Sequence, residues 1–202
     1  MTPTATLPAD DRLTRLVGLM DVVATFYRAN PDNPPKRMDI SREDVTELFR
    51  SLNQHQVQYL LVGGMATALH GYVRATEDLD LWIRVGEANK VNLIAALLDN
   101  DVAGADLLKN VPLLFGWTSV VAGKRGFTLD MGYALKAFSD ADFDACYSRA
   151  VDASFDGVPF KVIQLNDLIT EKLATGRDKD LLDVKELTKL TNRNMNDADV
   201  TD

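Results

Sequence analysis

The sequence predicts a mixed α/β (α+β) fold, with a small mixed sheet flanked by helices, an appended N-terminal helix and a C-terminal helical part. Two observations support this class. Short apolar runs with strand-like alternation are interleaved with stretches whose apolar residues recur at helical spacing. The composition, 46% hydrophobic and 26% charged over 202 residues, is typical of a globular chain and not of a disordered one.

The charge and the cysteine content narrow the functional classes. Thirty acidic against 22 basic residues give a net charge of −8, which disfavours a broad surface for long nucleic acids. Cys146 is the single cysteine, and His55 and His70 are the two histidines, so a Cys/His zinc site lacks ligands and a bound metal would need carboxylates. No apolar run reaches the ~20 residues of a bilayer span, and the first residues lack a signal-peptide pattern, so we expect a cytoplasmic protein without membrane partners.

Residues 1–40 are expected to form an appendage. Apolar residues recur at helical spacing between Asp11 and Asn30, which predicts an amphipathic helix. The prolines of residues 30–35 then predict a stiff linker, because proline interrupts both helix and sheet. The apolar stripe of this helix needs a surface to pack on, either its own domain, a second copy of the chain or another partner.

The main domain is expected over residues 41–191, followed by a polar tail over 192–202. Its first helix begins after Ser41, which forms a pattern like a capping box with Asp44, and ends near Asn53. The other expected elements are a strand at 57–62, a helix from Met65 to His70, a strand at 78–83, a helix at 87–98 with Val91, Ile94, Ala95 and Leu98 on one side, strands at 111–117, 120–121 and 127–131, a helix at 140–147, a hairpin at 151–163 that turns at Asp156-Gly157, and two helices from Leu165 onward that meet near Gly176.

Two carboxylates alternate with apolar residues in the expected strand at 78–83. Asp78 and Asp80 project from the same face, roughly 6.5–7 Å apart at Cα, so one divalent ion can bridge them. Their like charges repel unless a cation or hydrogen bonds neutralise them. Asp130 lies on the polar face of another expected strand and would complete a three-carboxylate cluster if the two strands were neighbours. The alternative is a solvated strand face that carries two aspartates by chance.

Gly63 and Gly64 stand between a strand and a helix. Glycine leaves the backbone N–H groups bare, so a phosphate can approach them at the positive end of the helix. The same pair also serves ordinary turns, so this motif alone is weak evidence for a phosphate site.

At these residues the chain resembles the polymerase-beta-like nucleotidyltransferase superfamily, whose signature is a Gly-Gly or Gly-Ser turn followed by Asp-h-Asp-h on a strand, where h is apolar. Here Val62-Gly63-Gly64 is followed, after thirteen residues, by Asp78-Leu79-Asp80-Leu81. Residues 74–81 and 168–184 look like the motifs of the bacterial AbiEii/MenT-like branch. The resemblance covers about residues 57–190 and leaves the first forty outside.

The resemblance implies an enzyme of the nucleotidyltransferase fold that transfers a nucleoside monophosphate from an NTP to a hydroxyl of a protein, an RNA end or a small molecule. Asp78, Asp80 and Asp130 would hold one or two Mg²⁺ (or Mn²⁺) ions, and Asp130 would accept the proton of the attacked hydroxyl. The residues implied in nucleotide binding are Gly63, Gly64, Arg74, Thr76, Lys172, Asp180 and Asp183. Among them, the two glycines would cradle phosphates, Lys172 would face the triphosphate, and Asp180 or Asp183 would orient the lysine or the ribose. Gly64 stands where many relatives carry serine, which removes one hydroxyl from the phosphate site.

Plainer interpretations stay open beside this one. The chain can be a catalytically silent module that binds a nucleotide or a partner, for example one half of a toxin–antitoxin pair or a homodimer through its N-terminal helix. The carboxylate set favours the enzyme, because a retired site has no reason to keep clustered like charges. Arg74 can pair with Glu77 or Asp78 at the surface, Lys172 can be a solvated helix residue, and Asp183 can support its helix through Lys179. Trp82 can stack on a base or pack in the core.

Overall fold

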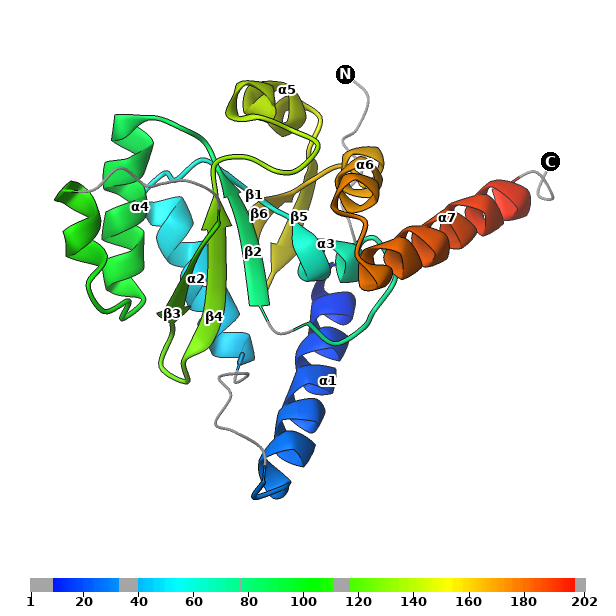
Figure 1. The fold of residues 1–202 in the computed structure, drawn as a ribbon, viewed down its shortest axis with the longest axis horizontal. Helices are drawn as coiled ribbons and strands as arrows, with labels where there is room; N and C mark the ends of the chain where they lie inside the picture. The colour runs from blue at the N-terminus through cyan, green and yellow to red at the C-terminus, as the bar shows by residue number, and fades with distance from the viewer. Residues whose placement is uncertain (1–8, 33–39, 77, 111–116, 199–202) are drawn as a thin grey trace.

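Helices surround one mixed sheet in the computed structural model of the chain, which describes residues 9–32, 40–76, 78–110 and 117–198 (Figure 1). The strands are β1 (Tyr59–Leu61), β2 (Asp78–Ile83), β3 (Trp117–Ala122), β4 (Phe127–Gly132), β5 (Val151–Phe155) and β6 (Val158–Val162). The helices are α1 (Ala9–Ala29), α2 (Arg42–Gln54), α3 (Gly63–Leu69), α4 (Glu87–Asp99), α5 (Phe143–Ser148), α6 (Leu165–Thr175) and α7 (Asp178–Ala198), with short 3-10 helices η1 (Ala105–Asn110) and η2 (Asp140–Asp142). The predicted α/β class is confirmed.

The strand order in the sheet is β3-β4-β2-β1-β6-β5. β2 runs antiparallel to β1 and parallel to β4, and the register of the parallel pair places Asp80 opposite Asp130. β1 joins β6 in parallel, which attaches the β5–β6 hairpin to the other side of the sheet. The centre of the sheet is therefore built from strands that are far apart in the sequence.

The two faces of β2 differ in chemistry, as its alternating sequence predicts. Leu79, Leu81 and Ile83 are buried on the face that α2 and α4 cover (Figure 1). Phe49 of α2 stacks on Tyr59, the residue of β1 that pairs with Ile83, with ring centroids 6.2 Å apart. The opposite face of β2 carries the two aspartates. The apolar core thus supports the sheet from behind the acidic side chains.

Several local signals are read correctly from the sequence. Ser41 caps α2 by accepting the Asp44 N–H at 3.1 Å. Asp156 and Gly157 take positive φ values of 50° and 74°, the backbone geometry of a two-residue hairpin turn between β5 and β6. Gly176, with a φ of 68°, ends α6 at the expected place. Helix α3 begins at Gly63, two residues before the expected start at Met65.

The expected apolar side of α4 is correct for Ile94, which is buried, but wrong for Val91 and Leu98. Val91 and Leu98 are 63% and 47% exposed. The amide of Asn89 explains the rotation of the helix, because it accepts from the Gln58 N–H and donates to the carbonyls of Gln58 and Arg84. These bonds turn another side toward the sheet. The buried side of α4 consists of Asn89, Leu93, Ile94, Ala96 and Leu97.

The N-terminal helix packs on its own domain. Leu13, Leu16 and Met20 of α1 are fully buried in the same core as the central sheet, and α1 lies beside α3 and β5. The linker expected after α1 falls partly on residues 33–39, and the strand expected from residue 111 falls on residues 111–116, which both lie outside the described residues.

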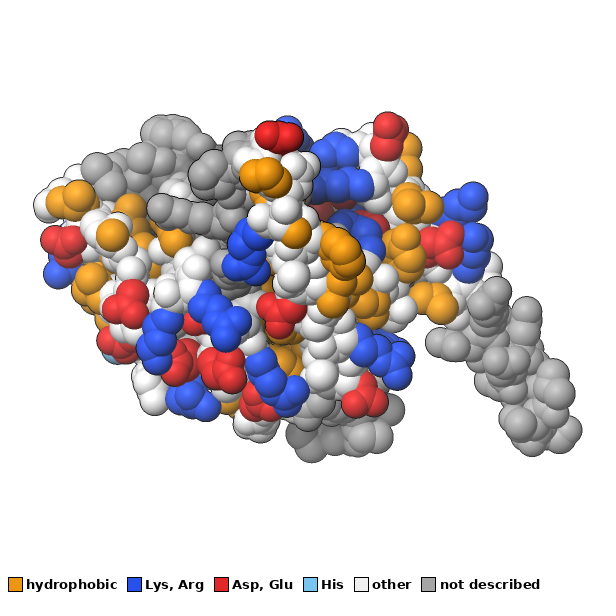
Figure 2. All heavy atoms as spheres, turned by 90° about the horizontal axis from the view of Figure 1, so that it is seen from below, with side chains coloured by type: hydrophobic (Ala, Val, Ile, Leu, Met, Phe, Trp, Pro, Cys, Tyr) orange, Lys and Arg blue, Asp and Glu red, His pale blue; other side chains and the backbone are white. Residues whose placement is uncertain are grey.

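The C-terminal helix is longer than the sequence predicts. α7 continues to Ala198, so the segment expected to be a polar tail from Asn192 is helical as far as that residue. Among the described residues, no helix combines the length and the apolar character that a membrane span requires. On the face shown in Figure 2, acidic and basic side chains are interspersed.

Truncating the buried side of α1 tests whether this helix belongs to the core. We expect Leu16→Ala to lower the free energy of unfolding by ~2–5 kcal/mol, because it leaves a cavity in a packed core. Leu19→Ala, on the outer side of the same helix, should cost less than about 1 kcal/mol. Urea unfolding followed by circular dichroism measures both. Equal, small losses would mean that α1 folds apart from the domain.

Candidate metal and nucleotide site

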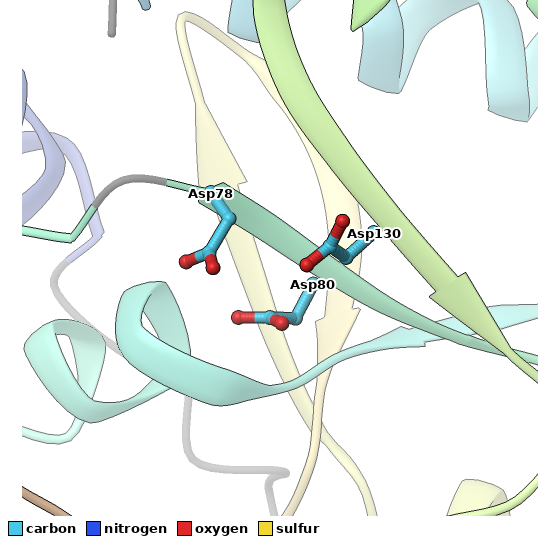
Figure 3. Close-up of side chains that lie close together, drawn as sticks. All are labelled: Asp78, Asp80 and Asp130. Atoms are coloured by element: carbon cyan, nitrogen blue, oxygen red, sulfur yellow. The ribbon is translucent and has the colours of Figure 1, made fainter. Parts of the chain in front are cut away.

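Three carboxylates meet on one face of the sheet. Asp78 and Asp80 come from β2, and Asp130 comes from the neighbouring parallel strand β4 (Figure 3). One oxygen atom of each carboxylate lies within 4.8 Å of those of the other two. The adjacency of these strands, which the three-carboxylate hypothesis requires, is therefore present.

The electrostatics of this cluster indicate a missing positive charge. Burial, together with the negative charges of Asp78 and Asp130, raises the pKa of Asp80 to about 7. The Asp130 Oδ1 atom is buried and has no hydrogen-bond partner, which is costly for a carboxylate oxygen. Three clustered carboxylates form the oxygen-rich set that Mg²⁺ and Mn²⁺ prefer. The residues present therefore fit a divalent cation.

The glycine turn packs directly against this cluster. A Cβ atom on Gly63, whose φ is 63°, would lie 1.8 Å from Asp80 Oδ2, and one on Gly64 would lie 2.4 Å from Thr76 Oγ1. Thr76 in turn donates its hydroxyl to Asp78 Oδ1 at 2.8 Å, and the Gly64 N–H reaches Asp80 Oδ2 at 3.4 Å. The absence of side chains thus leaves room for the carboxylate of Asp80 at Gly63 and for Thr76 at Gly64, a role that the sequence alone does not reveal.

An ion-pair network built on two buried carboxylates and the buried Lys172 stands beside the carboxylate cluster. Lys172 Nζ donates to Asp183 Oδ2 at 2.6 Å and to Asp180 Oδ1 at 3.3 Å. Arg74 binds both carboxylate oxygens of Asp183 at 2.6 and 2.7 Å, and Arg177 Nε donates to Asp180 Oδ2 at 2.5 Å. Three cations face two carboxylates, so the network carries a net charge of +1.

The network contradicts the plainer interpretations of Lys172 and Asp183. Lys172 is buried and not solvated, and Asp183 is fully buried against Arg74 and Lys172 instead of serving Lys179. Burial by itself would raise the pKa of Asp183, but hydrogen bonds from Arg74 and Lys172 outweigh it and lower that pKa. The motif residues implied by the resemblance, from residue 74 to residue 183, thus meet in space.

A cavity of about 310 Å³ lies between the acidic cluster and the network. Its wall includes the two glycines, Thr76, the three carboxylates of the cluster, Arg74, Lys172, Arg177 and Asp180. Glu171, next to Lys172 on α6, shapes another part of the wall by accepting the backbone N–H groups of Lys136 and Ala137 at 3.1 and 2.8 Å. No local pattern in the sequence points to Glu171, because its partners belong to a loop 34 or more residues away.

Of the two interpretations of Trp82, packing in the core is confirmed, whereas Trp117 has a position that the sequence did not indicate. Trp82 is fully buried between Phe138 and Phe143 and donates its indole N–H to the Tyr133 carbonyl at 3.0 Å, so it packs in the core and cannot stack on a base. Trp117, which the motif analysis did not select, lines the cavity from β3. Only the register of β3 on β4 brings it there.

Comparison with known proteins gives a family for most of the chain. The model of a family described as a nucleotidyltransferase of unknown function (DUF6036) matches residues 41–198. The chain is also similar to the crystal structure of an antigenic nucleotidyltransferase-like protein from Paracoccidioides brasiliensis, at 19% identity, with 78% of this chain and 79% of that chain covered and a TM-score of 0.47. A search of curated proteins found no match.

The raised pKa of Asp80 predicts a pH-dependent gain from its neutral isostere. The ordinary pKa is 3.8 and the folded one about 7. Between these values the folded state holds a proton that the unfolded state releases, so the free energy of unfolding falls as pH rises and stays lowered above pH 7. We expect Asp80→Asn to raise the melting temperature of the metal-free protein at about pH 8 and much less at about pH 4. Thermal unfolding in EDTA measures this, and an equal shift at both pH values would contradict it.

Removal of Lys172 should destabilise the fold. Lys172→Ala leaves Asp180 and Asp183 buried with one cation fewer, and we expect a loss of roughly 3 kcal/mol in the free energy of unfolding, the lower end of the range for broken buried pairs, because Arg74 and Arg177 remain. Lys179→Ala, an exposed lysine on the wall of the same cavity, is the matched control and should change stability by less than about 0.5 kcal/mol. Denaturant titration of both variants decides whether the Lys172 pairs support the fold.

Proposed function

The chain belongs to the DUF6036 family of nucleotidyltransferases, and on that basis we propose that it transfers a nucleoside monophosphate from an NTP to an acceptor hydroxyl with the help of Mg²⁺ or Mn²⁺. The observation that carries this proposal is the convergence of Asp78, Asp80 and Asp130 within 4.8 Å, with one buried oxygen left without a partner. A purely structural cluster of like charges would be destabilising without a compensating ligand.

The two sides of the cavity would bind different parts of the metal–NTP complex. The acidic cluster would hold the metal ions near the α-phosphate. The cationic network would attract the β and γ phosphates, since its net charge is positive and its Arg177 and Lys172 are close enough to influence the carboxylates electrostatically. Gly63 and Gly64 line the same cavity, where their backbone can approach a phosphate oxygen once the long bond from the Gly64 N–H to Asp80 is released. Lys136 and Lys179 make no ion pair within the described residues and add positive charge to the wall.

The proposed reaction is an in-line displacement at the α-phosphorus. The acceptor oxygen forms a bond to that phosphorus while the bond to the oxygen that bridges to the β-phosphate breaks, and pyrophosphate leaves with that electron pair. The acceptor proton passes to a carboxylate oxygen of Asp130, which lies at the far side of the cluster from the glycine turn. Bound divalent ions would supply charge stabilisation for the phosphates and the attacking oxygen.

The narrower relationship to the AbiEii/MenT-like branch stays part of the proposal. It is supported by the way in which Arg74, Lys172, Asp180 and Asp183, the residues of its two motifs, join in one network. A role as one half of a toxin–antitoxin pair, with a cognate partner, rests on this resemblance alone.

Nucleotide binding should depend on the acidic cluster. Titration calorimetry with an unreactive α,β-methylene NTP and Mg²⁺ should show binding by the wild-type chain and an affinity about ten-fold or more weaker for Asp78→Asn/Asp80→Asn. Without the metal, the two proteins should differ little in their affinity for the analogue. Asp106→Asn, an exposed aspartate outside the cavity, is the control. Unchanged affinity in the double variant would make the cluster structural.

Turnover then distinguishes the enzyme from the silent module. With an NTP labelled at the α-phosphate, label should pass to a component of an RNA, protein or small-molecule fraction, whereas a γ-phosphate label should appear in pyrophosphate. Asp130→Asn should abolish transfer while the chain stays folded. If the wild-type chain binds the NTP but transfers no label to any fraction, the silent module is the correct interpretation.

A further inference from the structure

Trp117 presents a large aromatic surface to the cavity. It is the first residue of β3, its side chain is 40% exposed, and it lines the same cavity as the acidic cluster. An exposed indole is unusual, because the ring carries a large apolar area that folding normally removes from water. Its position beside polar and charged groups calls for a ligand with a flat ring.

Gly132 sets the position of this indole. Trp117 and Gly132 are register partners on β3 and β4, two residues along the strand from Asp130. A Cβ atom on Gly132 would lie 3.0–3.2 Å from three atoms of the indole, so the ring rests against the bare backbone of β4. The glycine thus lets the ring lie over the strand that carries Asp130, with its remaining surface toward the cavity.

The sheet order places Trp117 on the opposite side of the cluster from the glycine turn. From one side to the other, the cavity presents the turn that follows β1, the carboxylates of β2, Asp130 on β4 and Trp117 on the edge strand β3. In an in-line displacement the attacking oxygen and the leaving pyrophosphate lie on opposite sides of the phosphorus. With the pyrophosphate at the glycine turn and the cationic network, the attacking group approaches from the side of Asp130 and Trp117.

We propose that Trp117 is the binding platform for the acceptor, and that the acceptor carries a nucleobase next to its hydroxyl, as in a nucleoside or an RNA 3′ end. This inference rests on the proposed function. Stacking suits such an acceptor, because every base offers a flat π-face while the ribose hydroxyl projects beyond the ring. The indole would hold the base of the acceptor. Asp130, two residues along β4 from the register partner of Trp117, would then lie near the hydroxyl.

The two tryptophans of the chain provide a direct test, since Trp82 is buried and Trp117 is exposed. The probes are adenosine and a short single-stranded oligoribonucleotide with a 3′ hydroxyl, each titrated in the presence of Mg²⁺ and the α,β-methylene NTP. We expect both the free nucleoside and the RNA end to quench the indole fluorescence of the wild-type chain. Trp117→Phe, which keeps only Trp82, should lose this quenching and retain part of the affinity.

Affinity measurements complete the test. Trp117→Ala should weaken the acceptor probes by about ten-fold or more and leave the affinity for the Mg²⁺–NTP analogue within about two-fold. Gly132→Ala, which displaces the indole without removing it, should weaken the same probes. Phe26→Ala is the matched control, because Phe26 is an aromatic residue on the exposed side of α1, and should change neither affinity.

Each other result overturns the platform. If Trp117→Ala weakens the NTP analogue as much as the probes, the indole holds the base of the donor; if it weakens neither, the ring only packs on β4. Binding of tyrosine amide through Trp117 with the affinity of adenosine would assign a protein acceptor instead. Failure of the wild-type chain to bind the NTP analogue at all would refute the proposed function. A titration of adenosine without the analogue then tests the contact with Trp117 separately.

Discussion

The parallel pairing of β2 with β4 is the constraint on which the site depends. It brings Asp130 beside Asp78 and Asp80 although about fifty residues separate them, and it forces three like charges within 4.8 Å. Backbone hydrogen bonds and the apolar rear face of the sheet hold the strands together against this repulsion. The apolar core behind the site therefore holds the strands in place, and a bound cation would relieve the repulsion between the carboxylates in front of it.

Charge around the cavity is arranged in two unlike groups. The three carboxylates of the acidic cluster are not neutralised by cations, whereas the network of Arg74, Lys172 and Arg177 has one cation more than its two carboxylates. A metal-bound polyphosphate has cations to offer the first group and anionic oxygens to offer the second. The lysine that the motif singles out is held in place by buried carboxylates, so it presents its charge at a fixed position instead of searching with a flexible chain.

Local chemistry was readable from the sequence, and long-range pairing was not. The alternation of Asp78-Leu79-Asp80-Leu81 gives the two faces of β2, and Asp156-Gly157 gives the hairpin, because each depends only on neighbours in the chain. The ion pair of Asp183 with Arg74 joins residues 109 positions apart, and no periodicity in the sequence predicts it. The rotation of α4 was missed because the helix offers two apolar sides, and the side with Leu93 and Leu97 faces the core together with the hydrogen-bonded Asn89. Trp117 was missed for a similar reason: its importance comes from lying opposite a glycine on another strand.

Neighbouring residues of α6 hold two walls of the cavity. Lys172 anchors the helix to α7 through Asp180 and Asp183, while Glu171 clamps the backbone of the loop at Lys136 and Ala137 that follows β4. Because both contacts originate within one helical turn, a displacement of α6 pulls on both walls together. Asp183 on α7 also binds Arg74 directly, so α7 is tied both to α6 and to the segment that leads into β2. A shift of α7 would therefore reach the cavity by two routes, through Lys172 and through Arg74.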